Sequence, residues 1–128
     1  MKNCLNKLVA RLRPLQLSLE VLTNMKRLGS ELADSENDLT EKQLALLFAI
    51  AETQQRLNES RKLQKQFDGD PDMWLKFATK SQQDSSLLRA LLKDVIAISP
   101  QAKKPVDNAM DDWVGIVWYS PALIGKRV

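Results

Sequence analysis

The chain of 128 residues is 44% hydrophobic and 27% charged, with only 5% aromatic residues, four glycines and five prolines. This composition is typical of one helix-rich globular domain, and it excludes a fibrous chain and a chain disordered throughout. The formal net charge is +3, and the isoelectric point is about 9.1.

The residue types present also exclude most kinds of catalytic and metal site. The sequence has no histidine and a single cysteine, Cys4, so it lacks the usual zinc ligand sets, an internal disulfide and histidine-based acid-base catalysis. Two carboxylate pairs, Asp68 with Asp70 and Asp111 with Asp112, are predicted to be loop and helix-cap residues. We therefore expect neither an enzyme nor a protein that binds a metal or a cofactor.

The first predicted helix is marked by leucines at spacings of three and four, which form the apolar stripe of an amphipathic helix: Leu5, Leu8, Leu12, Leu15, Leu19 and Leu22. Pro14 lies within this stripe, and a proline inside a helix costs about 3 kcal/mol. Either the helix begins near Pro14, or it continues there through a kink. The pattern goes on through Leu28 and Leu32, and it predicts a helix over residues 15–33.

A loop over residues 34–40 precedes the second predicted helix, because the segment ADSENDLT is rich in residues that favour caps and turns. Thr40 and Gln43 have the spacing of a capping box, which places the start of the helix at Glu41. The helix is predicted to run to Gln66. Its apolar seam consists of Leu39, Leu46, Ile50 and Leu57.

The third predicted helix covers residues 72–98. Asp70 and Pro71 mark its beginning, since aspartate caps a helix and proline suits the first helical position. Its apolar face consists of Trp74, Leu75, Phe77, Ala78, Leu88, Leu91, Leu92, Val95 and Ile96. Three long amphipathic helices with short connections predict an all-α fold, in which residues 1–99 form an antiparallel bundle or coiled coil.

Residues 100–128 differ in character from the predicted bundle. The stretch SPQAKKPVDNAM holds two prolines and is predicted to be a linker, which the aromatic segment WVGIVWYSPALI follows. Such a segment is expected to be covered by the bundle as a clamp, by a partner protein or by a membrane interface. We favour a partner contact or a clamp, and the candidate partner-binding residues are Trp113, Ile116, Trp118, Tyr119 and Leu123.

The first 27 residues carry six basic side chains and one acidic side chain, a local net charge of +5. They contain no aromatic residue that would stack on bases, so we interpret them as a solvated helix face and do not expect nucleic-acid binding. The longest apolar run, residues 44–51, is too short to cross a bilayer, and the N-terminal segment lacks the apolar core of a signal peptide. We expect a cytoplasmic protein without a membrane anchor.

The stretch EKQLALLFAIAETQQRLNES, residues 41–60, and the later stretch PDMWLKFATKSQQ resemble the middle of the FlgN-type flagellar export chaperones. Members of that family show Glu-Lys followed by leucines, a helix rich in glutamine and arginine, a break, and a tryptophan that opens the next long helix. The matching positions are Glu41, Lys42, Leu46, Leu47, Gln55, Arg56, Leu57 and Trp74.

The resemblance implies a bacterial cytoplasmic chaperone that keeps hook-filament junction proteins unassembled and delivers them to a type III export gate. It also implies that residues 100–128 contact the secreted subunit and the export apparatus. Two alternatives stay open. One is a small helical regulator that binds nucleic acid through its basic N-terminal arm, and the other is a coiled-coil adaptor whose leucine seam forms a homodimer.

Overall fold

The computed structural model of the protein describes residues 2–33 and 39–114. This part of the chain is helical and contains no β-strand, which confirms the predicted all-α class. In chain order the elements are α1 (Lys2–Leu12), the 3₁₀ turn η1 (Arg13–Leu15), α2 (Leu19–Leu32), α3 (Glu41–Gln66), α4 (Pro71–Ile98), the 3₁₀ turn η2 (Pro100–Ala102), α5 (Lys103–Ala109) and the π-helical turn η3 (Met110–Val114).

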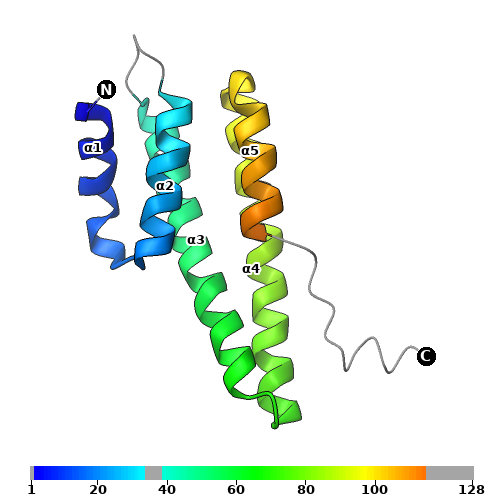
Figure 1. Ribbon diagram of the computed structural model, residues 1–128. Helices are drawn as coiled ribbons and strands as arrows, with labels where there is room; N and C mark the ends of the chain where they lie inside the picture. Colours follow the sequence, from blue (N-terminus) through cyan, green and yellow to red (C-terminus); the bar gives the residue numbers. More distant parts are fainter. Residues whose placement is uncertain (1, 34–38, 115–128) are drawn as a thin grey trace.

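The first predicted helix is in fact two antiparallel helices (Figure 1). α1 ends at Leu12, and the chain reverses through η1, which contains Pro14, and through Gln16, whose backbone is left-handed with φ 51°. α2 begins after Ser18, whose hydroxyl oxygen accepts the Val21 N–H at 3.3 Å. The structure therefore has neither a helix that begins at Pro14 nor one that kinks there, because the chain turns back at the proline.

This turn also changes which leucines are buried. Leu8 and Leu12 on α1 are fully buried, but Leu19 at the start of α2 is 80% exposed. The expectation that Leu19 belongs to the apolar seam is wrong, since its spacing from Leu15 was counted along a helix that the turn interrupts.

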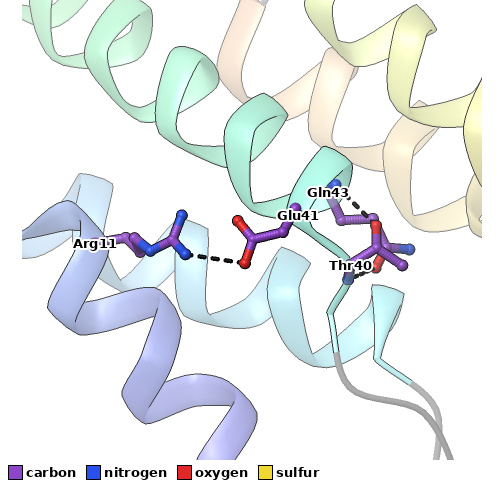
Figure 2. A network of polar contacts seen from close by, with 4 residues as sticks. All are labelled: Arg11, Thr40, Glu41 and Gln43. Atoms are coloured by element: carbon purple, nitrogen blue, oxygen red, sulfur yellow. Dashed lines mark hydrogen bonds and ion pairs between the residues drawn. The ribbon is translucent and has the colours of Figure 1, made fainter.

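The start of α3 matches the prediction and ties three elements together. Thr40 Oγ1 accepts the Gln43 N–H at 3.1 Å, and Gln43 Oε1 accepts the Thr40 N–H at 2.8 Å, which completes the capping box (Figure 2). Arg11 of α1 forms an ion pair with Glu41 at 3.0 Å (Figure 2). Gln43 Nε2 also donates to Ser99 Oγ, just beyond the end of α4, at 2.9 Å. The first turn of α3 is thus joined to α1 and to the far end of α4.

α3 and α4 form a long antiparallel hairpin, and their predicted bounds are confirmed to within one residue (Figure 1). Asp70 caps α4 as predicted, because its carboxylate oxygen accepts the Met73 N–H at 3.2 Å and Pro71 takes the first helical position.

Residues 100–114 differ from the linker that the sequence predicts. They form η2, α5 and η3, which run back beside the C-terminal half of α4 (Figure 1). The two prolines are compatible with this, because Pro100 and Pro105 lie in the first turns of η2 and α5, where the backbone N–H groups have no helical partner. This segment adds five buried residues to the core: Ala102, Val106, Ala109, Trp113 and Val114.

The core lies where α1, α2, α5 and the adjoining halves of α3 and α4 meet. Ile50, predicted for the seam of α3, is 0% exposed. The largest fully buried side chains are Leu8, Leu12, Val21, Met25, Leu44, Leu47, Ile50, Leu57, Leu88, Leu92, Val95 and Val106. Burial of each such side chain stabilises the fold by roughly 1.5 to 3 kcal/mol relative to exposure.

Candidate interaction surface

Part of the α3–α4 hairpin extends beyond the bundle. Gln55, midway along α3, accepts the backbone N–H of Ser18 at 2.9 Å, and Ser18 caps the first turn of α2. α2 therefore begins level with Gln55, and the hairpin continues past its end (Figure 1). We call residues 56–84 the distal hairpin. An ion pair between Arg56 Nε and Asp84 Oδ1, at 3.5 Å, joins its two helices at the base.

The distal hairpin has a polar interior. From residue 58 to residue 87, the buried side chains are all polar: Ser60, Gln64, Ser81 and Asp84. On either side of this stretch the buried residues are apolar again, with Leu57 on α3 and Leu88 on α4. Since buried polar groups bring little net stabilisation, this part of the hairpin is held together more weakly than the bundle.

Apart from Leu57 at its base, the apolar side chains of the distal hairpin are partly or largely exposed. Phe67 and Phe77 stack at its tip, with ring centroids 5.6 Å apart. Trp74 is partly buried, and Leu75 beside it is 49% exposed. These side chains present apolar surface to solvent at the end of the molecule farthest from the core.

Two grooves adjoin the distal hairpin, and Arg61 and Gln64 line both of them. The large groove, of about 560 Å³, lies between the start of α2 at Glu20 and the hairpin at Trp74. Its remaining lining residues are Asn58, Lys62, Lys65 and Asp68. The small groove, of about 170 Å³, is lined mainly by polar side chains of α4 and by Val114. The larger volume falls in the range of about 300 to 1,000 Å³ that is usual for binding clefts.

Arg61 connects the distal hairpin to the end of η3. Its guanidinium donates from Nη1 to the carbonyl oxygen of Trp113 at 3.3 Å, and from Nη2 to that of Val114 at 2.8 Å. Burial lowers the pKa of Arg61, because the charged form loses hydration. The carbonyls at the end of a helix carry partial negative charge, so they stabilise this cation and fix the guanidinium in place.

The structure places one of the predicted partner-binding residues in the core. Trp113 is 8% exposed and packs with the buried side chains of the bundle. It also lines a hollow of about 200 Å³ between α2 and α5, beside Arg27 and Pro105. In this structure Trp113 therefore stabilises the bundle. The other four predicted residues, Ile116, Trp118, Tyr119 and Leu123, lie outside the described residues, and their role stays a prediction.

The polar residues that distinguish the distal hairpin were not predicted as functional, although the sequence carries a signal for them. Ser60 and Gln64 follow Leu57 at spacings of three and four, and Ser81 and Asp84 precede Leu88 in the same way. The helical seam thus continues through the distal hairpin with polar residues in place of leucines.

Neither a metal site nor a membrane span is found in the part of the chain that the structure describes. Within residues 2–33 and 39–114, no three potential metal ligands cluster, and no helix is long and apolar enough to cross a bilayer. No protein-family model matches the chain, and no curated protein or solved structure was found to be similar to it.

Proposed function

We propose that the protein is a bacterial cytoplasmic chaperone of the FlgN type, which binds an amphipathic helical segment of a secreted flagellar subunit before export. The distal hairpin is the observation that carries this proposal. It is a pair of helices that extends from a stable bundle, borders a groove of about 560 Å³ and exposes apolar side chains.

A helix-in-groove contact would suit this surface. An amphipathic helix could lay its apolar face against Trp74 and Leu75, and a third helix would give the distal hairpin the apolar burial that it lacks. The large groove has three cationic lining residues and two acidic ones, which favours a segment with acidic residues on its polar side. Hook-filament junction proteins, which the resemblance implies as substrates, have amphipathic helical termini that would otherwise assemble prematurely.

The homodimeric adaptor is less well supported than the chaperone, because leucines of the stripe are buried inside the single chain. Leu8 and Leu12 of α1 and Leu28 and Leu32 of α2 are all at most 5% exposed. A coiled-coil dimer would need these side chains on its surface.

Fluorescence anisotropy with a labelled peptide tests the chaperone proposal. The peptide carries the C-terminal amphipathic helix of a hook-filament junction protein, and we expect saturable binding that changes little when salt rises from 0.1 to 0.5 M. Leu75→Asp should weaken binding about tenfold, because it places a charge in the apolar contact.

Ile98→Asp is the matched control. Ile98 is 40% exposed and Leu75 is 49% exposed, but Ile98 lies at the opposite end of α4, so its substitution should leave binding unchanged. Equal effects of the two substitutions would contradict the proposed surface. Salt-sensitive binding of a labelled DNA duplex, with no binding of the peptide, would instead support the nucleic-acid regulator.

A further inference from the structure

The small groove contains a cation without an anionic partner. Arg61 is half-buried, and its hydrogen bonds go to two neutral carbonyl groups, those of Trp113 and Val114. Of the described residues that line the groove, none is acidic, and Arg89 adds a second positive charge. Buried charges in proteins are usually paired with an opposite charge, so two adjacent cations without one favour an anion in this groove.

The part of the sequence that follows Val114 offers no acidic side chain to neutralise Arg61. Residues 115–128, which follow the groove at Val114, contain two basic side chains and no acidic one. Asp84, an acidic side chain of α4 in the distal hairpin, already pairs with Arg56 at 3.5 Å. The side chains that line the small groove thus supply no anion for Arg61, and the acidic residues Glu20 and Asp68 line the large groove instead.

The groove also holds hydrogen-bond donors that are buried and unused. Ser81 is 4% exposed, and its hydroxyl has no hydrogen-bond partner. The Nε–H of Arg61 is buried and unpaired as well, although the two terminal nitrogens of the same guanidinium are engaged. A buried polar group without a hydrogen-bond partner destabilises the fold, and one acceptor group that reaches both donors would satisfy the two of them together.

Size and lining indicate which anion fits. A volume of about 170 Å³ lies below the roughly 300 to 1,000 Å³ that is usual for clefts that bind larger ligands. The groove suits a small group such as a carboxylate on a short aliphatic stem, with Ala78 and Val114 as apolar walls. Asp84, one helical turn from Ser81, has a buried and unpaired carboxylate oxygen, which disfavours a dianion more than a monoanion.

We propose that the small groove binds a single carboxylate, the acidic side chain of a bound polypeptide, between Arg61 and Ser81. Carboxylate binding follows from the groove alone. Only the idea that the carboxylate belongs to an exported subunit rests on the proposed function. In that setting the partner helix lies along the large groove with its apolar face against Trp74 and Leu75, and the small groove recognises one glutamate or aspartate of the same partner.

Nuclear magnetic resonance of the full chain tests the carboxylate site directly. Glutamate capped as N-acetyl and N-methylamide is titrated into ¹⁵N-labelled protein, and the Nε–Hε signal of Arg61 is followed. We expect a saturable shift with a dissociation constant in the millimolar range, as suits a single small group. Capped glutamine, which has the same shape without the charge, should cause no saturable shift.

The substitution Ser81→Ala tests whether the hydroxyl contributes to carboxylate binding and not to the stability of the fold. The variant should weaken capped-glutamate binding about tenfold, as expected for the loss of one hydrogen bond to a charged group. Its melting temperature without ligand should be equal to or above that of the unchanged protein, because the substitution removes an unsatisfied buried hydroxyl. Arg13→Gln, at an exposed position on η1, is the control and should leave both quantities unchanged.

Several results would overturn the proposal. These are equal shifts with capped glutamine, unchanged binding in Ser81→Ala, or saturable binding of inorganic phosphate without binding of capped glutamate. The last result would make the groove a phosphate site. Because the peptide experiment with Leu75→Asp uses a different surface, failure of the carboxylate site leaves the chaperone proposal standing, and the reverse also holds.

Discussion

Gln16 is the only described residue other than glycine with a positive φ, and its left-handed backbone makes the reversal between α1 and α2 possible. A side chain with a Cβ atom pays roughly 1 kcal/mol in this region, which glycine avoids. The residue is exposed, so its replacement removes no packing.

Gln16→Gly should therefore raise the free energy of unfolding, by about 0.5 kcal/mol after the greater freedom of glycine in the unfolded chain is counted. Urea denaturation of the two proteins measures the difference. Gln16→Ala serves as the control and should bring no gain, because alanine keeps the Cβ atom. A stabilised alanine variant would mean that the side chain of Gln16, and not its backbone, is unfavourable.

Aspartate substitutions at Leu19 and at Ile50 should differ strongly in their effect on stability. An aspartate at position 50, where the side chain is 0% exposed, would bury a charge without a partner and should cost several kcal/mol. An aspartate at position 19, where the side chain is 80% exposed, should change stability by less than about 0.5 kcal/mol. Circular dichroism melts of both variants check this, and a strongly destabilised Leu19→Asp would show that this leucine is covered in solution.

At the scale of elements, the sequence predicts where a helix begins better than it predicts which helices pack against each other. The capping box at Thr40 and the Asp70–Pro71 start depend on a few neighbouring residues, so they can be read locally and are confirmed. The reversal after α1 is different, because a leucine stripe with one proline fits a kink as well as a turn. Only the packing of α1 against α2 and α3 decides between them.

The polar interior of the distal hairpin predicts uneven stability along α3 and α4. Amide hydrogens of residues 58–66 should exchange at least tenfold faster than those of residues 44–57, because the hairpin can open locally without exposing the apolar core. Deuterium exchange followed by mass spectrometry resolves the two ranges. Equal protection along all of α3 would show that the distal hairpin unfolds only with the rest of the molecule.

At the scale of the whole molecule, the segment after α4 closes the bundle. Two prolines and scattered charges are typical of a linker, and nothing local reveals that Val106, Ala109 and Trp113 become buried. Their burial depends on the contacts of this segment with α2, which lies far away in the sequence, and with α4, along which the chain folds back. For the same reason, the sequence does not show that Arg61 reaches the end of η3.

Two truncations test this role. Deletion of residues 101–128 removes five buried core residues, and it should lower the melting temperature by more than 10 °C, since loss of a buried tryptophan alone costs about 3 to 5 kcal/mol. Deletion of residues 115–128 keeps these side chains and should change the melting temperature by only a few degrees. Similar losses in both proteins would mean that residues 115–128 also contribute to the stability of the bundle.

The hairpin that extends past Gln55 has a mechanical consequence. Eleven residues of α3 continue beyond this point, which at 1.5 Å per residue is an arm of about 16 Å. A tilt of roughly 10° at the base would move its tip by about 3 Å, since displacement grows with the length of a lever. Arg61 lies midway along this arm and is hydrogen-bonded to the end of η3, so bending of the arm would pull on Trp113 and Val114.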